Sequence, residues 1–91
     1  LRWNPKIREL RALIRRTRQS LGDVRAPVLI IQSRRDETVS WKSAEILRRE
    51  LCHASSVNVM MLRRSEHGYL YPDERDAIYD AICDFTIKQI L

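Results

Sequence analysis

The chain has 91 residues and a net charge of +5, with 44% hydrophobic and 32% charged residues, a balance typical of a folded protein rather than a disordered segment. A domain of this length buries a smaller fraction of its surface than one of 150 residues, so its core is expected to be thin. Its longest apolar runs, such as VLII and VMML, fall far short of the roughly 20 apolar residues that a membrane-spanning helix needs.

Residues 1 to 24 are predicted to form a basic amphipathic helix. Asn4 can cap this helix, Pro5 suits its first position, and Gly22 can end it. The net positive charge comes from this segment, because residues 1 to 25 carry eight Lys and Arg against two acids, while the remainder carries nine against ten. The apolar positions at helical spacing are Ile7, Leu10, Leu13 or Ile14, and Leu21, and the basic residues opposite them are Arg8, Arg11, Arg15 and Arg18.

An arginine-rich helix face can attract nucleic acid or an anionic surface. No aromatic or glycine-rich RNA-binding pattern accompanies it, so nucleic acid is not expected as a partner. The preferred interpretation is a solvated face, or a contact with the missing part of a larger protein. Binding of an acidic partner through this helix is the alternative.

Residues 25 to 91 are predicted to contain two strands that alternate with two helices. The apolar run from Val28 to Ile31 follows Pro27 without polar alternation, as in a strand covered on both faces. A second strand is predicted over Val57 to Leu62. Because a helix connects the two strands, they are expected to be parallel.

The helix between the strands is expected to start from Ser40 as its cap and to end near His53. Its apolar positions are Trp41, Ala44, Leu47 and Leu51. Asp73 can cap the last helix. The residues of that helix expected to face the core are Ile78, Ala81, Ile82, Phe85 and Ile90.

The expected fold class is therefore α/β, with the order α-β-α-β-α and an incomplete sheet. Two apolar parallel strands leave at least one sheet edge unpaired, and such edges associate with other chains. The 91 residues are interpreted as the end of a larger sheet, with Leu1 as a point of excision. Self-association through the open edge, as a non-catalytic interaction module, is the alternative.

The two cysteines, Cys52 and Cys83, lie 31 positions apart, without a further Cys or His at metal-ligand spacing. No metal site, redox pair or cofactor is therefore expected. Both are interpreted as small buried hydrophobic residues, which fits a reducing, cytoplasmic location. Cys52 neighbours His53, but adjacent helical residues do not face each other, so no dyad is expected.

Asp36 and His67 each lie in the loop after a predicted strand, and ligands of open α/β sheets gather at this edge. A carboxylate that accepts from one imidazole nitrogen leaves the other free to take a proton from a nucleophile. The alternative is an Asx turn at Asp36 and an ordinary loop residue at His67. Glu37 and Glu66 are expected to be solvated charges. The residues expected to pack the two loops are Val39, Trp41, Tyr69, Leu70 and Tyr71.

Two segments, APVLIIQSRRDETVSWKSAEIL and SEHGYLYPDERDAIYDAICDF, resemble the C-terminal part of an α/β-hydrolase. They are most similar to the group of serine carboxylesterases, monoacylglycerol lipases and serine aminopeptidases, and the resemblance covers about residues 25 to 90. It implies that the helix of residues 1 to 24 is the end of that family's cap or the helix before its seventh strand. It implies that Asp36 is the acid and His67 the base of a Ser-His-Asp triad. It also implies hydrolysis of a small-molecule ester, acylglycerols among them, and leaves the acyl chain and the choice between ester and amide open.

The sequence departs from that family at two points. Ser33 stands where many members have glycine in G-x-x-D. The larger departure is that no G-x-S-x-G nucleophile elbow and no oxyanion-hole loop exist, since the only glycines are Gly22 and Gly68. The chain alone is therefore expected to be inactive. The serines that lack an elbow are Ser20, Ser33, Ser40, Ser43, Ser55, Ser56 and Ser65.

Overall fold

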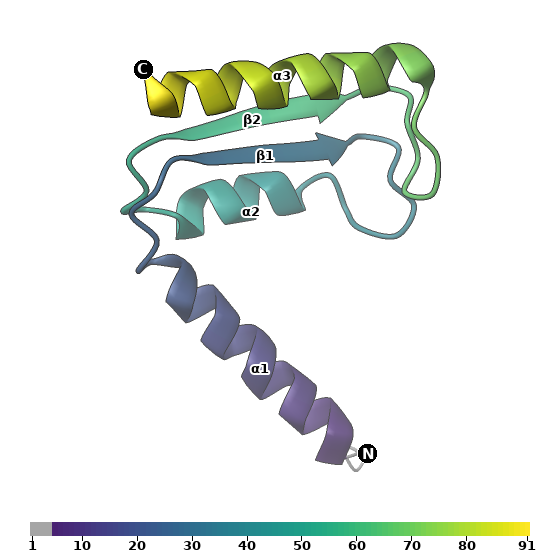
Figure 1. The fold of residues 1–91 in the computed structure, drawn as a ribbon. Helices are drawn as coiled ribbons and strands as arrows, with labels where there is room; N and C mark the ends of the chain where they lie inside the picture. The colour runs from purple at the N-terminus through teal and green to yellow at the C-terminus, as the bar shows by residue number, and fades with distance from the viewer. Residues whose placement is uncertain (1–4) are drawn as a thin grey trace.

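The computed structural model describes residues 5–91 and shows a mixed α/β arrangement of three helices and two strands (Figure 1). The elements are α1 (Pro5–Leu21), β1 (Val28–Ser33), α2 (Ser43–Glu50), β2 (Val57–Leu62) and α3 (Pro72–Ile90). The strands are parallel, as predicted, with Val28 opposite Val57 and Ser33 opposite Leu62. In the described part of the chain they form an open sheet of the order β1-β2, in which each strand has one neighbour. The expected cap Asn4 lies outside the described residues.

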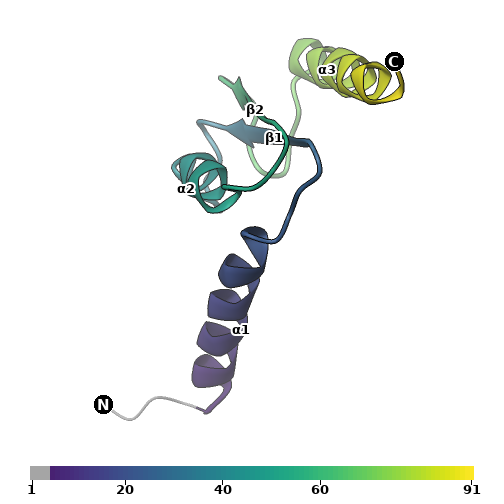
Figure 2. The same ribbon diagram turned by 90° about the vertical axis from the view of Figure 1, so that its left-hand side faces the viewer.

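The sheet lies between α2 on one face and α3 on the other (Figures 1 and 2). The small hydrophobic core is on the α2 side, where Ile30 of β1 packs with Ala44 and Leu51. Side chains alternate between the two faces of a strand, so Val28 and Ile30 of β1 point to the same face of the sheet. Val57 lies opposite Val28 on β2 and contributes to this face. The partly buried hydrophobic residues around the core are Leu21, Val24, Val28, Ala54, Val57 and Met61.

Helix α3 buries fewer of its apolar side chains than its sequence predicted. Ile78, Ala81 and Phe85 are half-buried, but Ile82 and Ile90 are exposed, with 44% and 77% of their surface accessible. The prediction for these two residues was wrong because α3 has apolar residues on two sides, and only one side can contact the sheet. In this structure α3 therefore covers the sheet with one side and presents the other to solvent.

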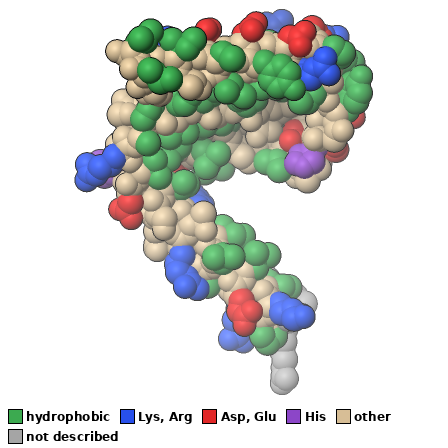
Figure 3. Space-filling view, viewed as in Figure 1, with side chains coloured by type: hydrophobic (Ala, Val, Ile, Leu, Met, Phe, Trp, Pro, Cys, Tyr) green, Lys and Arg blue, Asp and Glu red, His purple; other side chains and the backbone are tan. Residues whose placement is uncertain are grey.

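Helix α1 projects from the rest of the molecule and buries none of its residues (Figure 1). The molecule extends over 49 × 30 × 16 Å, and its radius of gyration is 15.9 Å, whereas a compact domain of this length would have about 12 Å. Basic and apolar side chains are both exposed along this helix (Figure 3). Within residues 5–91, no helix is long and apolar enough to cross a membrane.

Two helices begin at other residues than expected. The Ser40 hydroxyl accepts the Lys42 N–H at 3.2 Å, but a turn precedes the helix, and α2 begins only at Ser43. α3 begins at Pro72 rather than after Asp73, because proline suits the first helical position, where no N–H is needed. Asp73 instead lies in the first helical turn, where the helix dipole favours a carboxylate.

Candidate active site

Asp36 and His67 meet at one edge of the sheet. The loops that contain them follow the carboxyl ends of β1 and β2, and both emerge on the same side of the molecule (Figure 1). Asp36 Oδ2 lies 3.1 Å from His67 Nδ1. The structure thus brings together the two residues that the sequence singled out, although 31 positions separate them.

The second oxygen of the Asp36 carboxylate fixes the turn that follows β1. Asp36 Oδ1 accepts the backbone N–H groups of Thr38 and Val39, both at 2.8 Å. Asp36 therefore makes an Asx-type turn and contacts His67 at the same time, because each role uses a different oxygen. Its side chain is 11% exposed, whereas that of His67 is 51% exposed and open to a reacting group.

The pKa of Asp36 is lowered from its ordinary value of 3.8 to about 2. The Val39 N–H contributes most, partial burial opposes the shift, and the contacts with His67 and Thr38 lower the pKa further. The carboxylate is therefore ionised at neutral pH and can only accept hydrogen bonds. His67 must then carry its proton on Nδ1, which leaves Nε2 available as a base.

A short turn presents His67. The Glu66 N–H donates to the Tyr69 carbonyl at 2.9 Å, and the Tyr69 N–H donates back to the Glu66 carbonyl at 3.3 Å. The His67 N–H also donates to Glu37 Oε2 at 3.3 Å, so Glu37 contacts the turn although it is exposed to solvent. Gly68 has no positive φ, and a Cβ there would meet no atom within 4 Å. The turn therefore does not depend on this glycine.

No serine in the described part of the chain can act with His67 in this structure. Ser65 has no exposed surface and Ser33 is 7% exposed, so both hydroxyls are closed to a substrate. His67 forms hydrogen bonds with Asp36 and Glu37, and none with a serine hydroxyl of residues 5–91. Within residues 5–91, the site therefore combines a carboxylate and an imidazole without a serine hydroxyl in contact with them.

The apolar residues beside the pair are more exposed than a packing role implies. The exposed fractions of Val39, Trp41, Tyr69, Leu70 and Tyr71 lie between 37% and 57%. Trp41 lies under the Arg34 guanidinium, 4.6 Å from it, and the rings of Tyr69 and Tyr71 meet edge to face at 5.2 Å. These residues give the surroundings of the pair an open, partly aromatic surface.

The interpretation of the cysteines was wrong, since both Cys52 and Cys83 are exposed free thiols. Cys52 Sγ also lies 3.5 Å from His53 Nδ1, because α2 ends at Glu50 and the two residues lie in a turn. His53 Nδ1 is 2.8 Å from the Gly22 carbonyl, so this nitrogen carries a proton and cannot take one from the thiol. Among residues 5–91, no group of three His, Cys, Asp or Glu could hold a metal ion.

Sequence reasoning missed Glu74, in the first turn of α3. Its carboxylate accepts the backbone N–H groups of Arg63, Arg64 and Ser65 and the Ser65 hydroxyl. These contacts, with that of the Ser65 hydroxyl first, lower the pKa of Glu74 from its ordinary value of 4.5 to about 2. The only sequence signal was an acidic residue at the start of a helix, which helix polarity alone would explain.

We expect the protein to lose stability as the pH falls from about 4.5 to about 2. Asp36 and Glu74 have lower pKa values in the folded chain, so the unfolded chain binds more protons in this range. Their contribution is complete above their ordinary pKa values and disappears below the folded ones. Urea unfolding at several pH values measures this dependence. It should be flatter in Glu74→Gln, and an unchanged dependence would contradict the assignment.

Comparisons with protein-family models, curated proteins and solved structures find no match to this chain. Its function is therefore inferred from the geometry of the pair and from the residue pattern. An imidazole whose Nε2 is free can take a proton from a nucleophile and later give it up, and an ionised carboxylate at Nδ1 stabilises the protonated ring.

Proposed function

We propose that this chain supplies the acid and the base of a Ser-His-Asp triad in a serine hydrolase of the α/β-hydrolase type. The proposed substrates are small carboxylic esters, acylglycerols among them. His67 Nε2 takes the proton of the serine hydroxyl during attack and gives it to the leaving alcohol, while Asp36 stabilises the imidazolium. The nucleophilic serine comes from sequence outside these 91 residues.

The contact between Asp36 Oδ2 and His67 Nδ1 carries this proposal. A surface aspartate would more often lie free in solvent, but here two backbone N–H groups orient the carboxylate and the imidazole faces it. The place of the pair, beyond the carboxyl ends of two parallel strands, supports the same interpretation. The resemblance of the two segments to carboxylesterases adds the reaction class. A cytoplasmic location belongs to the proposal, and the free thiols support it.

A serine-reactive phosphonate probe tests this function. We expect the probe to label a protein that contains these residues together with an upstream G-x-S-x-G segment, and not to label residues 1–91 alone. The absence of a serine in contact with His67 is the reason for the second expectation. Labelling of the 91-residue chain, or an unreactive longer protein without ester hydrolysis, would contradict the proposal.

One observation favours a second candidate, a non-catalytic interaction module. Helix α1 buries none of its residues and carries much of the positive charge, and both strands have an open edge. This candidate predicts salt-dependent binding of an acidic partner, or self-association, without any reaction with the probe.

A further inference from the structure

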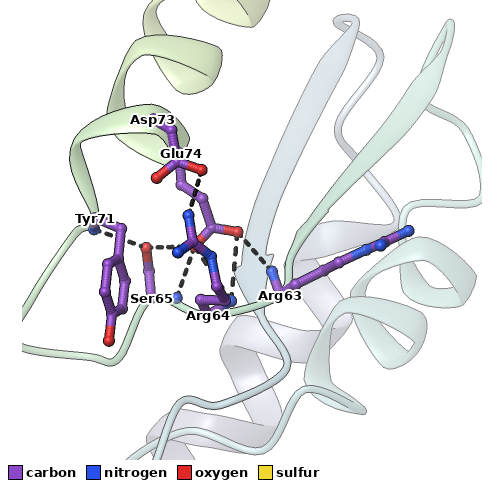
Figure 4. A network of polar contacts seen from close by, with 6 residues as sticks. All are labelled: Arg63, Arg64, Ser65, Tyr71, Asp73 and Glu74. Carbon is purple, nitrogen blue, oxygen red and sulfur yellow. Dashed lines mark hydrogen bonds and ion pairs between the residues drawn. The ribbon is translucent and has the colours of Figure 1, made fainter.

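The carboxylate of Glu74 is surrounded by the chain that leaves β2 (Figure 4). Oε2 accepts the Arg63 N–H at 2.7 Å, and Oε1 accepts the Ser65 N–H at 2.7 Å. The Arg64 N–H lies 3.2 and 3.3 Å from the two oxygens. Three consecutive backbone groups therefore converge on one carboxylate, which fixes the path of the chain two residues before His67.

The Ser65 hydroxyl extends this contact to both ends of the loop that contains His67. It donates to Glu74 Oε1 at 2.6 Å and accepts the Tyr71 N–H at 3.1 Å (Figure 4). Ser65 and Tyr71 flank the turn of residues 66–69. Because Ser65 has no exposed surface, water does not compete for its hydroxyl. The buried Ser65 hydroxyl oxygen, oriented by Glu74, thus connects the start of the loop at Ser65 with its end at Tyr71.

Ser33 joins this assembly to the turn of Asp36. Its hydroxyl donates to the Ser65 carbonyl and accepts the Arg35 N–H at 3.2 Å, while its own carbonyl accepts the Asp36 N–H at 3.4 Å. The hydroxyl in place of the family's glycine therefore connects the loops that follow β1 and β2. In the described residues, Ser33 and Ser65 are also the buried polar side chains.

We propose that Glu74, acting through Ser65, is a positioning residue that holds the turn of His67 against Asp36. It touches neither member of the pair, and it acts on the backbone and the hydroxyl that set where the turn begins and ends. Its importance for catalysis rests on the proposed function. Its effect on the geometry of His67 does not, and can be measured without any reaction.

Asp73 provides a matched control in the same helical turn. It pairs with the Arg64 side chain, and both groups are more than half exposed. Among the described residues, its carboxylate accepts no hydrogen bond from the loop backbone. Asp73→Asn therefore removes one carboxylate and one exposed ion pair next to Glu74. An exposed pair contributes about 0–1 kcal/mol, so this variant should fold normally.

The experiment measures the tautomer of His67 by nitrogen NMR of the 15N-histidine-labelled chain in Glu74→Gln and Asp73→Asn. In the wild type, Nδ1 of His67 carries the proton because it faces Asp36. In Glu74→Gln the amide NH2 group must face backbone N–H groups, so the turn shifts, and the Nδ1-protonated share should fall about twofold or more. Asp73→Asn should leave it unchanged. His53, which donates to the Gly22 carbonyl, is the internal reference.

An unchanged His67 tautomer in a folded Glu74→Gln variant would overturn the inference, as would an equal change in Asp73→Asn. Circular dichroism checks that each variant is folded. If Glu74→Gln loses its structure, the same NMR measurement on Ser65→Ala tests the inference instead. That variant removes only the hydroxyl and keeps the backbone contacts of Glu74. It should show the same tautomer change. Failure of the phosphonate probe would overturn the proposed function and leave this result standing.

Discussion

Replacing His67 with alanine is expected to lower ester turnover by about 10⁶-fold in a protein that contains these residues and their nucleophile. Without the imidazole the pair loses its base, because the remaining member, Asp36, is too weakly basic to take the proton of the serine hydroxyl, with a pKa of about 2. The measurement is kcat on an activated ester such as a p-nitrophenyl ester. The side chain is half exposed, so its removal should change folding little.

The double variant Asp36→Asn with His67→Ala provides the control. Residues that act as one unit give non-additive losses, so the double variant should be no less active than His67→Ala alone. Losses that multiply would instead indicate that the two residues act separately. A His67→Ala variant with near-normal turnover would remove the base from the proposal.

Asp36→Asn is expected to lower kcat by about 10⁴-fold while the chain remains folded, with only the stabilisation from the Asp36 charge lost. The amide oxygen of asparagine can still accept the N–H groups of Thr38 and Val39, so the turn remains. Its NH2 group then points at His67 Nδ1 and forces the proton onto Nε2. The imidazole is present but has the wrong tautomer to act as a base.

The measurement is again kcat, with the folded state checked by urea unfolding. Asp73→Asn is the matched control, since it neutralises an exposed carboxylate that does not contact His67. We expect this control to retain normal turnover. If Asp36→Asn were as active as Asp73→Asn, Asp36 would be a turn residue only.

The strands and the meeting of Asp36 with His67 could be predicted because they depend on local pattern and topology. An apolar run from Val28, a helix, and a second run from Val57 leave few arrangements other than a parallel pair. Parallel strands then bring the loops after them to one edge, whatever the side chains between them are. Neither step required knowledge of the packing.

The features that sequence did not reveal depend on contacts between distant residues. Ile82 and Ile90 have the spacing of core positions, but the narrow sheet contacts only the other side of α3. Glu74 looks like any acid at a helix start, and only the path of the chain after β2 shows what it binds. The buried hydroxyl of Ser33 is hidden in the same way, because its partner lies in the second loop.

Helix α1 amplifies small rotations at the end where it joins the rest of the molecule. Its 17 residues span about 25 Å. Two contacts with the body lie near its C-terminal end, Arg18 with Glu50 at 2.5 Å and, just after the helix, the Gly22 carbonyl with His53. A rotation of about 10° at that joint would move the distant end by about 4 Å, given this length. Small changes in the contacts near Gly22 are therefore magnified along the helix.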